Sequence, residues 1–217
     1  MAFFVRASAT NRRRNPVNYE LLHESHPEWG SLARVPDDSA LFGFSVARYA
    51  PGNAPAIGRH REGFESALCA WADARAVELI STAVSANDFA WTNLLPRLGF
   101  IAVDTSVEVF HPNLGRADFS AARLNVRTAT PEDREAVLRI AGSAFSFGRF
   151  HTDRRFPVAL AHRRYTAWAE RALDKANGEH RVYVIGEPGK AYGMFYAVLR
   201  DGLADIRLGA LAPEALT

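Results

Sequence analysis

The sequence is poor in several residue types, and each shortage excludes something. A single cysteine, Cys69, excludes an internal disulfide and an all-cysteine metal site. No run approaches the roughly 18 apolar residues that a membrane-spanning helix needs. Neither charge sign dominates, because 26 Lys and Arg stand against 24 Asp and Glu, so nothing favours nucleic acid as a partner.

The start of the chain has no signal-peptide pattern. Met1–Val5 is too short for an apolar signal core, and the Arg cluster follows it instead of preceding it. The first acidic residue is Glu20, so a transit peptide is an alternative interpretation. With one cysteine and no membrane segment, we predict a cytoplasmic protein without a membrane partner.

The first half of the chain predicts alternating helices and strands. Apolar residues Phe64, Leu68 and Trp71 recur at helical spacing. Asn87 or Asp88 is placed to cap a second helix. The expected elements are a strand over 40–49, a helix over 61–75, a strand over 76–84, a helix from 88 to 98 that ends at Gly99, and a strand over 100–110. Cys69 lies in the apolar run Ala-Leu-Cys-Ala-Trp, which favours a buried, inert thiol.

Residues 114–123 show no clear period, and we place a domain boundary there, with domains at 1–120 and 121–217. Thr130-Pro131-Glu132-Asp133 is a helix start, with a cap, a proline and an acid three residues after the cap. A later helix over 158–176 is expected to bury Val158, Ala161, Tyr165, Trp168 and Ala172. The expected strands cover 124–128, 181–185, 191–200 and 204–211, and the third of these is apolar on both faces, like an inner strand.

This order of elements resembles the first half of a GNAT-superfamily N-acetyltransferase. Arg127-Thr-Ala-Thr-Pro-Glu-Asp133 resembles the usual opening of that family, and two segments, 140–153 and 163–168, resemble the dTDP-fucosamine (TDP-4-amino-4,6-dideoxygalactose) acetyltransferases. The upstream segment 87–100, with its Leu-Gly-Phe, resembles the helix and strand that close a GNAT fold. The resemblance implies an α/β (α+β) fold. Its sheet is mixed and mostly antiparallel, is flanked by helices, and follows a reduced GNAT-like unit.

The family holds the acetyl-CoA pyrophosphate on a Gln/Arg-x-x-Gly-x-Gly/Ala loop after the fourth strand. In this sequence the fourth expected strand is followed by Pro213-Glu-Ala-Leu-Thr217, so that loop and the helix bearing the family's general acid are missing. The sequence therefore predicts a GNAT fold that is incomplete at its C-terminus. A shortened enzyme and an inactive relative are both open.

The resemblance also implies a cofactor site. A main-chain donor of the fourth strand polarises the thioester of acetyl-CoA in the family, and the corresponding residues here are Leu208, Gly209, Ala210 and Leu211. Gly209 fits a bulge or a close backbone approach. The alternative is that Gly209 only admits a large neighbouring side chain.

An acceptor site is implied by the link between the two helices. Phe147, Arg149, Phe150 and His151 lie in that link, where an arginine between aromatic rings suits a phosphate and a flat base or sugar face. His151 is a weak candidate for a general base. An ordinary loop whose phenylalanines pack on the sheet is the alternative.

Two function hypotheses follow. One is transfer of acetyl from acetyl-CoA to a small-molecule amine, with a nucleotide-linked amino sugar as the acceptor class. The other is an inactive GNAT-like binding or interaction module. His23-x-x-His26 has no ligand partner motif, so we predict no metal site. An uncovered fourth strand would be a sheet edge, which predicts a homodimer or poor solubility, unless the N-terminal unit covers that edge.

Overall fold

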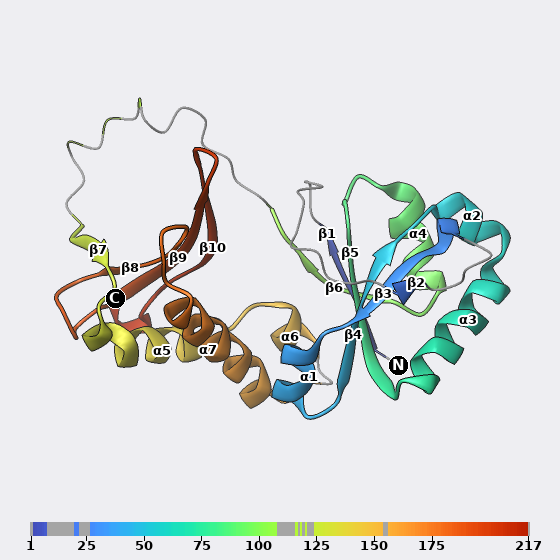
Figure 1. Cartoon of the computed structure of the whole chain (residues 1–217), viewed down its shortest axis with the longest axis horizontal. Helices are drawn as coiled ribbons and strands as arrows, with labels where there is room; N and C mark the ends of the chain where they lie inside the picture. Colours follow the sequence, from blue (N-terminus) through green and yellow to red (C-terminus); the bar gives the residue numbers. More distant parts are fainter. Residues whose placement is uncertain are drawn as a thin grey trace. The chain divides into compact units, whose positions relative to one another are not determined.

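The computed structural model describes residues 2–7, 20–21, 27–107, 116, 118, 120, 124–153 and 156–216. The chain forms two compact units (Figure 1). Unit 1 consists of Met1–Phe110 with Gly148–Arg155, and unit 2 of His111–Phe147 with Phe156–Thr217. Among the described strands, five of the eight strand pairs are antiparallel. The fold is therefore mixed α/β: the sheet of unit 2 is antiparallel, the sheet of unit 1 contains parallel and antiparallel pairs, and helices flank both sheets.

Unit 1 contains a six-stranded sheet in the order β2-β3-β4-β5-β1-β6. Strands β2, β3 and β4 pair antiparallel, whereas β4, β5, β1 and β6 pair parallel. Its elements are β1 (Ala2–Ala7), β2 (Glu20–Leu21), η1 (Pro27–Trp29), β3 (Gly30–Arg34), α1 (Pro36–Phe42), β4 (Ser45–Pro51), α2 (Ala54–Arg59), α3 (Arg61–Ala74), β5 (Val77–Val84), α4 (Phe89–Arg97), β6 (Ile101–Thr105) and α6 (Arg149–Thr152).

The helices expected in unit 1 are confirmed. Phe64, Leu68 and Trp71 of α3 are buried, as their helical spacing predicts. Asp88 caps α4 by accepting a hydrogen bond from the Trp91 N–H at 3.2 Å. Gly99 follows the helix with a φ of 81°, the left-handed conformation that glycine favours.

The core of unit 1 lies between its sheet and helices α2, α3 and α4. Tyr49 of β4 is almost fully buried and donates its hydroxyl to the Trp29 carbonyl. Its ring lies 5.8 Å from that of Phe64 and 5.9 Å from that of Trp91. Burial raises the pKa of Tyr49. The phenol therefore remains protonated and serves as a fixed donor inside an aromatic cluster.

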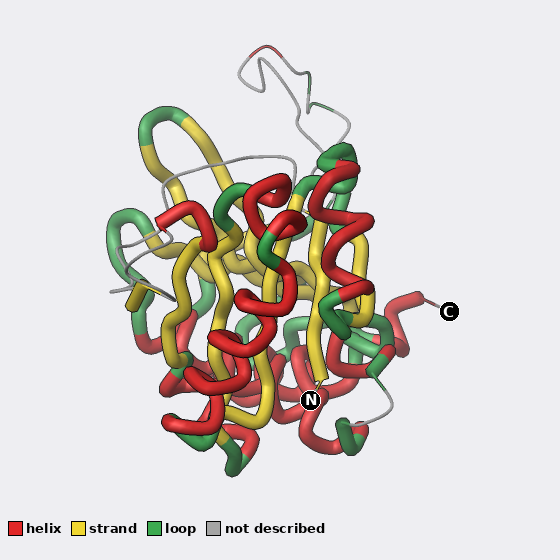
Figure 2. The backbone as a smooth tube through the Cα atoms, turned by 90° about the vertical axis from the view of Figure 1, so that its right-hand side faces the viewer, coloured by secondary structure: helices red, strands yellow, loops and turns green. Residues whose placement is uncertain are grey.

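Unit 2 contains a four-stranded antiparallel sheet in the order β10-β9-β8-β7, with α5 and α7 packed side by side against one face (Figure 1). Figure 2 distinguishes the helices of the chain from its strands by colour. Its inner strand β9 is the one whose sequence is apolar on both faces. The elements are β7 (Val126–Thr128), η3 (Pro131–Asp133), α5 (Arg134–Ser143), α7 (Val158–Asp174), β8 (His180–Ile185), β9 (Gly193–Arg200), β10 (Leu203–Leu211) and η4 (Pro213–Leu216).

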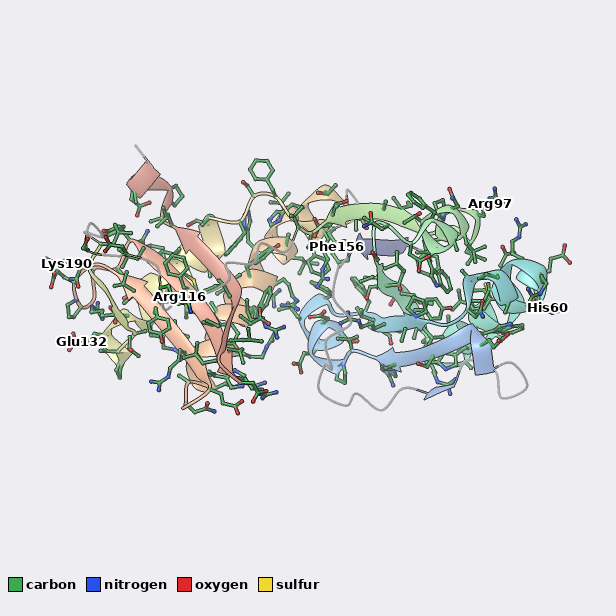
Figure 3. All side chains as sticks on the ribbon, turned by 90° about the horizontal axis from the view of Figure 1, so that it is seen from above. His60, Arg97, Arg116, Glu132, Phe156 and Lys190 are labelled. Atoms are coloured by element: carbon green, nitrogen blue, oxygen red, sulfur yellow. The ribbon has the colours of Figure 1, made fainter. Side chains whose placement is uncertain are left out.

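A buried ion pair closes one end of unit 2. Asp133 is fully buried and accepts hydrogen bonds from the Arg127 guanidinium at 2.6 and 2.8 Å. The same carboxylate accepts from the Thr130 N–H at 2.8 Å and from the Gly189 N–H at 3.0 Å. Figure 3 labels Glu132 in η3 and Lys190 in the β8–β9 loop, the two segments that this carboxylate joins. The acid placed three residues after the cap thus joins β7, the start of α5 and the β8–β9 loop.

Several expectations from the sequence are wrong. The strand expected over 40–49 begins only at Ser45, because Pro36 and the two acids after it start helix α1. Cys69 is exposed, since Phe64, Leu68 and Trp71 occupy the buried face of α3. Val158 is 59% exposed, because it is the first residue of α7.

Other expectations concern residues that the structure describes only in part. The strand expected over 100–110 ends at Thr105, and residues 108–110 lie outside the described ranges. His23, His26 and most of the boundary segment 114–123 also lie outside them. Within the described ranges, no helix combines the length and the apolar character needed to cross a membrane.

Candidate functional site

The four cofactor residues implied by the resemblance lie in the second half of β10. Leu208 is buried in the core beneath the helices, and Ala210 packs partly against it. Gly209 and Leu211 alternate with them and lie on the other face of the sheet, opposite Phe195 and Gly193 of β9. The four residues therefore contribute backbone groups more readily than side chains.

A β-bulge interrupts β10 just before this segment. Ile206 pairs with Ala197 and Leu208 pairs with Tyr196, so Arg207 has no pairing partner of its own on β9. The Arg207 guanidinium lies 2.7 Å from the Asp205 carboxylate. The expected irregularity of this strand is present, but it lies at Arg207 and not at Gly209.

Gly209 has a packing role instead. A Cβ placed on it would lie 3.0 Å from Cδ1 of Phe195, tighter than ordinary van der Waals contact. The neighbouring strand therefore supplies a large ring over the glycine, which is the alternative that the sequence left open.

The outer edge of β10 carries main-chain groups with a defined direction. The Ala212 N–H donates to the Tyr192 carbonyl at 2.7 Å, so it points toward β9. Because successive peptide groups alternate in direction, those of Gly209 and Leu211 point away from β9. Since β10 is the last strand of the described sheet, these groups face its open edge. The edge thus offers two donors and two acceptors, two residues apart.

The residues of the implied acceptor site lie on both sides of a unit boundary. Phe147 belongs to unit 2 and is 90% exposed. Arg149, Phe150 and His151 belong to unit 1, where they form most of the short helix α6. Phe150 is buried, and the Arg149 guanidinium lies 4.8 Å from its ring centroid. The two ring nitrogens of His151 are buried as well. The structure therefore assigns these three residues and the β10 segment to different units.

A second candidate site was missed by sequence reasoning. A pocket of about 440 Å³ opens in unit 2 between the start of α5, the end of α7 and the start of β8. Its lining residues are Thr128, Ala129, Thr130, Pro131, Arg134, Leu173, Ala176, Asn177, His180, Arg181 and Val182. His180 Nδ1 lies 2.7 Å from the Tyr196 hydroxyl. Burial raises the pKa of Tyr196, while Arg207 opposes that shift.

The His180–Tyr196 pair fixes one ring at the pocket wall. His180 Nδ1 and the Tyr196 hydroxyl share one hydrogen bond, and which of the two donates depends on the tautomer of the imidazole ring. No sequence signal marks this pair, because its members lie on adjacent strands and are not opposite each other: Val182 pairs with Tyr196.

Potential metal-binding side chains are scattered in the described part of the chain. No group of three or more His, Cys, Asp or Glu side chains is close enough there to hold an ion.

Comparison of the chain with protein-family models, curated proteins and solved structures gives no match in any of the three. The functional assignment must therefore rest on the geometry of the two units.

Proposed function

We propose that this chain is a GNAT-type N-acetyltransferase, which transfers acetyl from acetyl-CoA to the amino group of a small molecule. The acceptor class that we propose is a nucleotide-linked amino sugar. The observation that carries the proposal is the second half of β10, an edge strand interrupted by a bulge whose Gly209 and Leu211 peptide groups point outward.

The order of elements in unit 2 supports this reading. A strand, two helices and three antiparallel strands follow one another, and both helices cover the same face of the sheet. Such an edge can pair with an extended, amide-containing ligand as a further strand would. The pantetheine arm of acetyl-CoA contains two amides, so it can accept from and donate to the outward groups of Gly209 and Leu211.

Acetyl transfer needs a polarised thioester carbonyl and an uncharged acceptor amine. An N–H at the outer edge of β10 would supply the first, because it would donate to the thioester oxygen as negative charge develops there. The carbonyl carbon forms a bond to the amine nitrogen, the bond to sulfur breaks, and the amine loses a proton while the thiolate gains one.

Acetyl-CoA binding tests the proposal directly. A ligand at 100 times its Kd stabilises the folded state by about 2.7 kcal/mol, so unit 2 should melt several degrees higher in millimolar acetyl-CoA. Replacing Leu211 by Pro removes one outward N–H and leaves the hydrogen bonds to β9 in place. The shift should be lost in Leu211→Pro and kept in Leu211→Ala, which retains the N–H.

Release of free CoA with a panel of amines, including nucleotide-linked amino sugars, then tests the transfer itself. No thermal shift at millimolar acetyl-CoA would overturn the proposal for this chain. A shift with acetyl-CoA but no release of CoA with any amine would favour the second hypothesis, an inactive binding module.

A further inference from the structure

The connection between α5 and α7 has an unusual path. Both helices belong to unit 2, and so does Phe147 at the start of their connection. The next eight residues, Gly148–Arg155, belong to unit 1 by their contacts. The chain therefore passes through unit 1 in the middle of a connection whose two ends belong to unit 2.

The centre of this segment is held by an aromatic contact. Phe150 of α6 is only 5% exposed, and its ring centroid lies 5.1 Å from that of Phe42 in α1. Phe42 in turn stacks on Phe44 at 5.6 Å. Aromatic pairs at these distances contribute beyond the area that they bury.

Helix α6 cannot hold this conformation by itself. It has four residues, and only one turn of hydrogen bonds closes it, from His151 and Thr152 to the Gly148 carbonyl and from Asp153 to the Arg149 carbonyl. Isolated helices shorter than about 12 residues are marginal in water, so tertiary packing must supply the stability of α6.

Unit 1 presents Phe42 on a rigid support. The Ser39 hydroxyl donates to the Val35 carbonyl at 2.7 Å and accepts from the Val46 N–H at 2.8 Å, which ties α1 to β4. Gly43 ends α1 with a φ of 77° and so turns the chain directly into that strand. The aromatic surface that receives Phe150 is thus fixed to the sheet of unit 1.

We propose that unit 1 is a clamp for the α5–α7 link, and that Phe42 is the positioning residue that sets the conformation of that link by holding Phe150. The coupling does not depend on the proposed activity. Its consequence for acceptor binding rests on the proposed function, because the resemblance places the acceptor site at this link.

Hydrogen exchange of the full chain, followed by mass spectrometry, tests the clamp. In Phe42→Ala the amides of His151, Thr152 and Asp153 should exchange at least about tenfold faster than in the unchanged protein. Amides of β9 in unit 2 and of β5 in unit 1 should keep their rates. The control Phe89→Ala also removes an aromatic ring from unit 1, but from an exposed position, and it should change none of these rates.

The reciprocal variant Phe150→Ala guards against a folding defect in Phe42→Ala. It leaves α1 and its hydrogen bonds to β4 intact and should release the same three amides. If Phe42→Ala also increases the exchange rates of the β5 amides, that variant perturbs unit 1 as a whole. The exchange of residues 151–153 in Phe150→Ala then tests the clamp. Unchanged exchange of residues 151–153 in a variant whose β5 amides stay protected would overturn the clamp.

Acetyl-CoA binding, measured together with hydrogen exchange, separates the clamp from the proposed function. If acetyl-CoA does not bind, the proposed activity is wrong, but the exchange result for the clamp is unaffected. If acetyl-CoA binds but the amide exchange of residues 151–153 is unchanged in the variants, only the clamp proposal is wrong.

Discussion

Asp133 is the residue whose chemistry the structure defines most fully. Its carboxylate is buried and accepts hydrogen bonds from Arg127, Thr130 and Gly189, which come from three separate segments of unit 2. Removing one partner of a buried ion pair typically costs about 3–5 kcal/mol, because the other charge stays buried without compensation. Arg127 is partly exposed, with 20% of its side chain accessible, and water therefore recovers some of that cost.

We therefore predict that Asp133→Asn destabilises unit 2 by about 2–4 kcal/mol. Chemical denaturation followed by the fluorescence of Trp168 in α7 would measure the change. Glu132→Gln, one residue earlier and exposed, is the control and should shift the midpoint little. Equal midpoints for the two variants would contradict the role of the buried carboxylate.

The same carboxylate gives unit 2 a pH dependence of known sign. The hydrogen bonds from Arg127, followed by those from the Thr130 and Gly189 amides, hold the pKa of Asp133 well below its usual range. Because the folded-state pKa is lower than the unfolded one, the ionised carboxylate adds stability above the unfolded pKa of about 4. This stability is lost as the pH falls toward the folded-state pKa.

Unit 2 should accordingly keep a steady denaturation midpoint above about pH 5 and lose stability steadily below about pH 4. Asp133→Asn should reduce the slope of that acid loss, since it removes the titrating group. An acid profile that is the same in the variant and the unchanged protein would assign the loss to other carboxylates.

At the scale of elements, local patterns predicted what depends on neighbours in the sequence. The apolar spacing of Phe64, Leu68 and Trp71 was sufficient for α3, and the Thr130–Asp133 cap was sufficient for the start of the helical segment. Short helix α1 was missed because Pro36 and its two acids fit both a turn and a first helical turn.

The sequence patterns did not predict which distant segments pair with one another. Strand β1 inserts between β5 and β6, and nothing in its own residues specifies that place. The His180–Tyr196 pair and the contact between Phe42 and Phe150 likewise join residues that no local period connects. The residue types of the link were recognised, but their membership of unit 1 was not.

Two glycines near the end of β4 provide a matched test of packing at this scale. A Cβ on Gly52 would overlap the carbonyl oxygen of Glu28 in η1, which packs against the backbone just after β4. A Cβ on Gly58 in α2 would meet nothing. Both changes add the same methyl group, but Gly58 lies in a helix with space around it, whereas Gly52 lies against other backbone.

We expect Gly52→Ala to destabilise unit 1 by about 1–3 kcal/mol, because the two backbone segments must move apart. Gly58→Ala should instead stabilise it by about 0.5–1 kcal/mol, because alanine favours the helix and restricts the unfolded chain. Thermal unfolding of the two variants would show opposite shifts. Shifts of the same sign would contradict the close approach at Gly52.

At the scale of the whole molecule, we predict that the open edge of β10 governs the association between copies of the chain. Ile206 is 59% exposed on that strand, and the outward peptide groups of Gly209 and Leu211 lie beyond it. An edge of this kind pairs with other strands, whereas a bulge and charged side chains such as Asp205 and Arg207 weaken the pairing. The two tendencies together predict a weak homodimer that forms only at high protein concentration.

Light scattering across a concentration series would measure this association, and Ile206→Lys should abolish it by adding charge to the edge. Because the proposed acetyl-CoA site uses the same outward groups, millimolar acetyl-CoA should also shift the equilibrium toward the monomer. Phe89→Lys, a matched change at an exposed residue of unit 1, should leave the association unchanged. A monomer at every concentration would show that the bulge and the two charges are sufficient to protect the edge.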